Sequence, residues 1–172
     1  MLFAVIEIGG IMIGLKRFLV LIGRLLLSAI FILSAINKIF QWQQTQTALI
    51  NLFCDWQSYV SSIPFLARFF SSLITWVSEI LIIATVIELI AALLVFFGIK
   101  ERIGAFFLII FFIPATIILH PFWFLSGVKR SLQMIMFLKN LAIFSGLLLL
   151  MVFGSKIKED VILPPMSKPK KE

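Results

Sequence analysis

Four long apolar blocks, separated by shorter polar stretches, dominate the hydrophobic pattern of this chain. A helix that crosses a bilayer needs about 20 apolar residues at a rise of roughly 1.5 Å per residue. The pattern predicts four such helices, at about residues 18–40, 76–97, 103–119 and 132–153. The expected fold class is all-α: a polytopic membrane protein built as a four-transmembrane-helix bundle.

The connection at residues 41–75 has a different pattern. Apolar residues recur at spacings of three and four from Trp42 to Val60, with glutamines and other polar residues between them. This spacing predicts an amphipathic helix on the membrane surface, ending near Pro64. The sequence leaves open whether this helix is a packed cap over the bundle or a lid that contacts a ligand.

The two ends of the chain lie outside the four blocks. Residues 1–17 are largely apolar, and joined to the first block they would make a helix of roughly 60 Å, twice the thickness of a bilayer core. Two interpretations stay open: an N-terminal interfacial segment, or a true start at Met12 that leaves residues 1–11 outside the protein. Residues 155–172, rich in lysine and proline, predict a basic cytoplasmic tail after a membrane domain at 18–154.

Composition supports the membrane assignment, since 62% of the residues are hydrophobic and 13% are charged. The net charge of +7 does not predict nucleic-acid binding, because the cations flank apolar blocks and form no stripe on a soluble domain. The expected partner of these cations is the lipid bilayer.

The distribution of cations predicts the orientation. If the N-terminus is inside, the only loop cations on the outer side are Arg68, Lys129 and Arg130. The other loop and tail cations are then cytoplasmic. All four tryptophans and Tyr59 then lie at the outer interface. We expect a multi-pass protein of a bacterial inner membrane, with both termini cytoplasmic and the amphipathic helix extracytoplasmic.

Several classes of site are excluded by residue counts. Cys54 is the only cysteine and His120 the only histidine, so one chain offers no disulfide, CxxC pair, bis-histidine haem site or cysteine-rich metal centre. No nucleophilic triad, phosphate loop or dinucleotide fingerprint is present. No intrinsic cofactor or metal site is therefore expected.

The strongest site candidates are polar residues inside the predicted spans: Arg24, Lys38, Glu88, Lys139 and Asn140. A charge in the hydrocarbon costs about 2.5–3.5 kcal/mol on insertion scales, so such residues usually face the bundle interior and mark function.

One face of the first span carries residues spaced by three and four: Arg24, Ser28, Phe31, Ala35 and Lys38. Arg24 lies roughly 9 Å from the cytoplasmic end of its helix and Glu88 roughly 14 Å from the same surface. This difference is within the reach of an arginine, so we predict an Arg24–Glu88 pair in a polar core. The alternative is that the pair only sets the helix register.

A second cluster is predicted in the outer half of the bundle, formed by Lys38, His120, Lys139 and Asn140. Such a cluster would suit a small anion or the carbonyl oxygens of a quinone. The alternative is that both lysines extend to the interface and His120 caps its helix. Glu79 lies on the opposite face of its helix from Glu88, so it is expected to meet water or one of the lysines.

Short motifs in a fixed order resemble the DoxX family of four-helix bacterial membrane proteins over roughly residues 18–154. They are Gly23-Arg24-Leu25-Leu26-Leu27, Ile36-Asn37-Lys38, Glu88 followed by Gly98-Ile99-Lys100-Glu101-Arg102, Pro114-Ala115-Thr116 with His120, and Phe137-Leu138-Lys139-Asn140-Leu141-Ala142 before Gly146. The sequence departs from the family at Ala91 and Ala92, where members often have glycines.

The resemblance implies a relative of the small membrane subunit of thiosulfate:quinone oxidoreductase. It implies a membrane subunit associated with an oxidoreductase or a thiol or sulfur redox system, with a redox-enzyme partner and quinone as the bound cofactor. Two alternatives stay open: a small-solute or lipid-handling membrane protein, and a non-catalytic scaffold. The sequence leaves open whether the chain is itself an enzyme.

Overall fold

The computed structural model describes the backbone of residues 2–154, and side chains from Met12 onward except that of residue 13. This part of the chain contains no strand. Its elements are α1 (Leu2–Phe40), α2 (Trp42–Tyr59), α3 (Pro64–Thr75), α4 (Val77–Phe97), α5 (Glu101–Leu119), the 3-10 helix η1 (Phe122–Phe124) and α6 (Gly127–Phe153).

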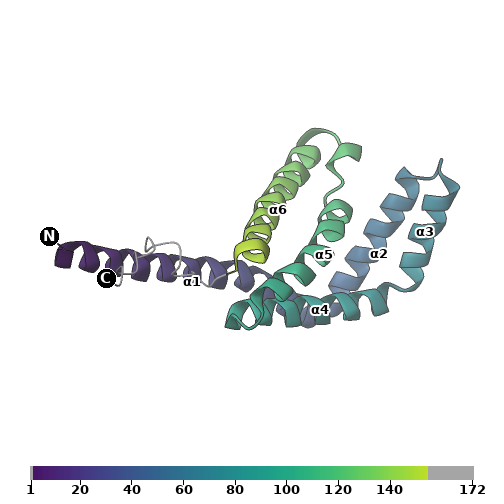
Figure 1. The fold of residues 1–172 in the computed structure, drawn as a ribbon. Helices are drawn as coiled ribbons and strands as arrows, with labels where there is room; N and C mark the ends of the chain where they lie inside the picture. Colours follow the sequence, from purple (N-terminus) through teal and green to yellow (C-terminus); the bar gives the residue numbers. More distant parts are fainter. Residues whose placement is uncertain (1, 155–172) are drawn as a thin grey trace, which may run out of the picture.

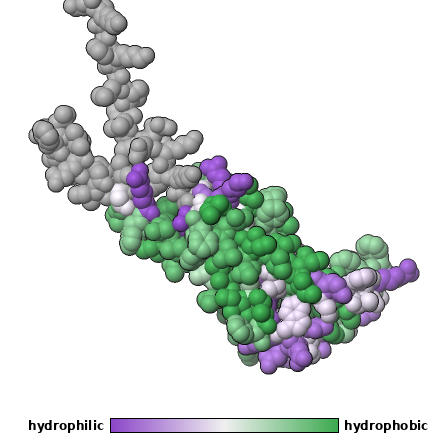
Figure 2. All heavy atoms as spheres, turned by 90° about the horizontal axis from the view of Figure 1, so that it is seen from below, coloured by the Kyte–Doolittle hydropathy of each residue, from purple (hydrophilic) through white to green (hydrophobic). Residues whose placement is uncertain are grey.

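Four segments are long and apolar enough to cross a membrane, as the sequence predicts: Gly14–Phe40, Val77–Phe97, Glu101–Phe124 and Gly127–Phe153. Figure 2 shows apolar side chains gathered over the middle of the molecule and hydrophilic ones toward its two ends. A band of this kind matches the hydrocarbon region of a bilayer between two polar interfaces. The all-α, multi-pass prediction is confirmed.

The spans pack in the spatial order α1, α4, α5, α6 (Figure 1). The helix α4 lies along both α1 and α5, and α5 lies along α6. By contrast, α1 and α6 touch at few positions, one of them where Leu27 faces Gly146. The bundle is therefore closely packed through α4 and α5 and open between α1 and α6.

Small residues allow α4 and α5 to approach closely. Ala91, Ala92 and Ala105 are all fully buried, and a Cβ atom on Gly104 would lie only 2.7 Å from the Ala91 carbonyl oxygen. Small side chains at a membrane helix interface let the two backbones come together, and van der Waals contact then stabilises the pair. The two alanines at the family's glycine positions still permit this contact.

The helix α4 ends in a hydrogen-bonded cap. Gly98 adopts a left-handed conformation with φ of 69°, its N–H donates to the Val95 carbonyl, and the Ile99 N–H donates to the Leu94 carbonyl. This pair of bonds is the Schellman motif, which favours glycine at the left-handed position. Glu101 then opens α5, where a carboxylate interacts favourably with the helix dipole.

The connection 41–75 contains two helices, not one. Pro64, predicted to end the amphipathic helix, instead lies in the first turn of α3, where its missing N–H leaves no hydrogen bond unmade. The helices α2 and α3 form a hairpin (Figure 1). Trp56 of α2 stacks on Phe70 of α3, with ring centroids 5.2 Å apart, and its indole N–H donates to the Ile118 carbonyl of α5.

The N-terminal segment continues into the first span without a break, so α1 is a single helix whose beginning extends beyond the other helices (Figure 1). The interfacial placement of residues 1–17 stays a prediction. The predicted tail, residues 155–172, lies outside the described residues.

Candidate functional site

The central polar feature of the bundle is an ion pair between Lys38 of α1 and Glu88 of α4. Glu88 is almost fully buried, with 3% of its side chain exposed, and Lys38 is 22% exposed. The Lys38 ammonium also donates to the Ser34 hydroxyl at 3.1 Å and lies 5.6 Å from the Phe111 ring centre. The lysine thus combines an ion pair, a hydrogen bond and a cation–π contact.

The predicted Arg24–Glu88 pair is wrong. Helical side chains lean toward the N-terminus of their own helix. Because α1 and α4 run in opposite directions, Lys38 and Glu88 lean toward each other, whereas Arg24 leans away from Glu88. Its guanidinium reaches the end of α4, where a Cβ atom on Gly98 would overlap it. The direction of lean therefore decided the pairing.

The buried face of α1 is as predicted. Ser28 and Ala35 are fully buried, and Phe31 is 2% exposed. Ser28 donates its hydroxyl to the Arg24 carbonyl one turn earlier, at 2.9 Å, so its burial leaves no unsatisfied hydroxyl proton.

A cavity of about 330 Å³ adjoins the ion pair. Its size is within the range of small-molecule sites. Its wall is mostly apolar, with the ion pair, three hydroxyl residues and one amide as polar points. The lining residues are Ser34, Lys38, Thr45, Leu49, Phe53, Ile80, Leu81, Ala84, Glu88, Phe111, Phe112, Pro114, Ala115, Thr116, Ile118, Leu119 and Asn140.

Asn140 of α6 is held on this wall by Thr116 of α5, whose hydroxyl accepts a hydrogen bond from the Asn140 amide at 3.2 Å. The bond leaves the amide oxygen and a second N–H for another partner. Pro114, inside α5 on the same wall, has no N–H to donate to the Ile110 carbonyl. Polar groups from α1, α4, α5 and α6 therefore meet at one cavity.

The predicted outer cluster is assembled only in part. Lys38 and Asn140 line the cavity, but His120 and Lys139 do not. His120 instead shares a hydrogen bond of 2.7 Å with Gln133. Lys139 is exposed and its ammonium contacts the Met136 sulfur at 3.4 Å. For Lys139 the reason is rotation: adjacent residues on a helix point about 100° apart, and the rotation of α6 that turns Asn140 to the cavity leaves Lys139 exposed.

The structure also decides whether Glu79 meets water or one of the lysines. Lys38 pairs with Glu88, and Lys139 contacts Met136. Glu79 is exposed in the first turn of α4, where a negative charge is favoured by the helix dipole.

The sequence left open whether α2 is a packed cap or a lid that contacts a ligand, and it identified none of the α2 residues that line the cavity. Thr45, Leu49 and Phe53 line the cavity and close its side, so α2 is both a packed cap and a wall of the candidate site. Their spacing of four was visible in the sequence, but that spacing identifies a face and not what it covers. Ser34 was also missed, although it lies one helical turn before Lys38.

Among the described residues, no group of three or more histidine, cysteine and acidic side chains is arranged to hold a metal ion.

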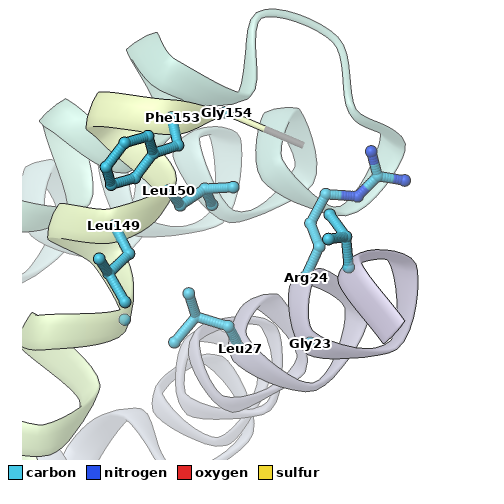
Figure 3. Close-up of a pocket in the computed structure, with 9 residues that line it drawn as sticks. Gly23, Arg24, Leu27, Leu149, Leu150, Phe153 and Gly154 are labelled. Carbon is cyan, nitrogen blue, oxygen red and sulfur yellow. The ribbon is translucent and has the colours of Figure 1, made fainter. Parts of the chain in front are cut away.

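A second opening lies at the other end of the bundle, between α1 and α6. It is a groove of about 430 Å³. Figure 3 shows Leu27 of α1 and Leu149 and Leu150 of α6 lining it, with the Arg24 side chain extending along one end.

Comparison with known proteins identifies one family. The family model described as DoxX matches residues 19–121, about three-fifths of the chain, from within α1 to the end of α5. The motif in α6 that contains Asn140 lies beyond this match. No curated protein and no solved structure matches the chain.

Proposed function

This chain belongs to the DoxX family, and on that basis we propose that it binds a quinone in the cavity beside Lys38 and Glu88, as a membrane subunit associated with an oxidoreductase or a thiol or sulfur redox system. The observation that carries the proposal is the buried ion pair on the wall of a mainly apolar cavity. A buried ion pair is a poor source of stability, because desolvation offsets most of the attraction. Polar groups kept inside a membrane bundle at such cost usually mark a functional site.

The charge balance favours a neutral ligand over a small anion. Glu88 already neutralises Lys38, so the cavity offers an anion no net positive charge. Its mainly apolar wall suits a ring with an apolar tail. The aromatic side chains Phe53, Phe111 and Phe112 supply flat surfaces against which a ring can pack.

The residues present fit such a ligand. The Lys38 ammonium and the Asn140 amide are hydrogen-bond donors that suit carbonyl oxygens, and both lie on the cavity wall. When bound, a quinone supplies two-electron, two-proton redox chemistry. Glu88, joined to Lys38, is the acidic group placed to hold a proton beside it. The electrons are proposed to come from a partner subunit.

The test is quinone binding to the purified protein. Trp56 is a reporter, because its indole N–H donates to the carbonyl of Ile118, which lines the cavity. We expect decylubiquinone to quench tryptophan fluorescence saturably. Ala115→Leu, which fills the cavity and leaves the ion pair in place, is expected to raise the apparent Kd at least tenfold. The double change Lys38→Met with Glu88→Gln is also expected to raise the apparent Kd at least tenfold, and it leaves no unpaired charge.

The matched control is Lys139→Met, which removes an exposed lysine outside the cavity and should leave quenching unchanged. Equal quenching of the wild type and the Ala115→Leu variant would contradict the site. Failure of every form to bind quinone would contradict the function. In that case, solute flux in liposomes would favour a transport role, and a stable protein partner from solubilised native membranes alone would favour a scaffold.

We also propose that the protein lies in a bacterial inner membrane with both termini cytoplasmic and the α2–α3 hairpin outside. The support is the cation asymmetry of the loops. Cys54, an exposed free thiol on α2, tests it: a membrane-impermeant maleimide should label intact cells.

The opposite control is a cysteine introduced at the exposed Lys100, in the turn between α4 and α5, on a Cys54→Ser background. It should react only after the inner face is opened. The reverse pattern would invert the topology.

A further inference from the structure

The groove between α1 and α6 has one apolar part and one charged end. Leu27, Leu149 and Leu150 form its apolar wall, and Arg24 lies at the end where α6 finishes at Gly154. It is separate from the cavity beside the ion pair, since the two share no lining residue.

The charged end lies at the depth of the membrane interface. The Arg24 guanidinium lies against Gly98, the last residue of the α4 cap, and the groove reaches Gly154, where α6 ends. Three spans therefore end or begin at this level, because α5 starts three residues after Gly98. Helix ends of transmembrane spans lie near the lipid headgroups, and the apolar wall then extends from there into the hydrocarbon.

Two arginines flank this end. A Cβ atom on Gly154 would lie 3.0 Å from Arg102 Nε, and an Arg102 guanidinium N–H donates to the Phe153 carbonyl at 2.9 Å. Among the described residues at this end, Arg24 and Arg102 contribute two positive charges, and Glu101, 3.2 Å from the same Cβ position, contributes one negative charge. The described side chains at the end of the groove therefore have a net positive charge. Guanidinium groups bind phosphate oxygens through paired hydrogen bonds.

The groove is open because of a glycine. A Cβ atom on Gly23 would meet no atom within 4 Å, so the residues that the structure describes leave the space beside it unfilled. Its volume of about 430 Å³ is that of a small-molecule site.

From these features we propose that the groove is a binding site for one anionic phospholipid molecule. Its phosphate binds Arg24 at the end flanked by Arg102, and one acyl chain lies along Leu27, Leu149 and Leu150. The lipid fills the gap between α1 and α6, which touch each other at few positions, and completes the bundle on that side. The inference is independent of quinone binding in the cavity.

The experiment is native mass spectrometry of the full chain, purified in mild detergent, delipidated and titrated with dioleoyl phosphatidylglycerol. We expect one tightly bound lipid. Gly23→Leu should weaken that binding at least tenfold by filling the groove, and Arg24→Gln should weaken it at least tenfold by removing the charge. Gly14→Leu is the matched control, because it makes the same change on α1 at another glycine with open space around it, outside the groove, and should bind like the wild type.

Each outcome is decisive. Loss in both groove variants, with normal binding by Gly14→Leu and an unchanged melting temperature of Gly23→Leu without lipid, supports the site. Loss in Arg24→Gln alone would mean a surface charge effect and would overturn the groove. Equal loss in Gly14→Leu would mean general binding to the helix surface. The proposal would also be overturned if inorganic phosphate alone occupied the site and prevented lipid binding. A dimer of the chain in place of the lipid adduct would overturn it as well.

Discussion

Replacing Lys38 with methionine is expected to lower the free energy of unfolding by about 3–5 kcal/mol, because it leaves a buried carboxylate without its partner. Glu88 has only 3% of its side chain exposed, so water cannot take the place of the ammonium group. A buried charge left without its partner in an apolar environment is unfavourable. Far-UV circular dichroism during unfolding in mixed micelles measures the change.

A double-mutant cycle separates the ion pair from other effects of the lysine. Glu88→Gln combined with Lys38→Met should be more stable than the sum of the single losses predicts, with a coupling energy of about 1–3 kcal/mol. Lys139→Met, at an exposed lysine that contacts Met136, should change stability by no more than about 0.5 kcal/mol. Additive losses at Lys38 and Glu88 would show that the two charges do not interact.

Gly104→Ala is expected to destabilise the protein by about 1–3 kcal/mol through overpacking between α4 and α5. The added Cβ would lie 2.7 Å from the Ala91 carbonyl oxygen and 2.9 Å from the Val95 Cγ2 atom. The first of these is backbone and can move only if α4 moves as a whole. The strain therefore outweighs the gain of about 1 kcal/mol that alanine brings over glycine within a helix.

The matched control is Gly23→Ala, the same substitution in α1 with no atom within 4 Å of the new methyl group. It should be neutral or stabilising by up to about 1 kcal/mol. Of the two variants, only Gly104→Ala is therefore expected to lower thermal stability. If Gly104→Ala melted at or above the wild-type temperature, the close α4–α5 contact would be contradicted.

The spans and the family were predictable because both depend on local patterns. An apolar block of bilayer length has few alternatives to a transmembrane helix, so the four predicted spans agree with the observed ones to within a few residues at most ends. The buried face of α1 followed from the 3.6-residue period alone, and Ser28, Phe31 and Ala35 are buried as expected. The family resemblance is confirmed over residues 19–121.

The hairpin was harder to predict because proline can either end a helix or begin one. Pro64 was interpreted as a stop, but it also opens α3. The outcome depends on whether the residues after it can pack, and Phe70 does so against Trp56.

The sequence by itself therefore determined the number of spans, their apolar surfaces and the set of polar residues that had to be placed inside them. Only the tertiary structure decided which of those residues meet. Partner choice depends on the direction in which side chains lean from antiparallel helices, so Glu88 took Lys38 and Arg24 turned to the end of α4. It also depends on the rotation of α6 about its own axis, which brings Asn140 to the cavity and leaves Lys139 exposed. Both quantities are set by packing between helices far apart in the chain, and no local pattern records them.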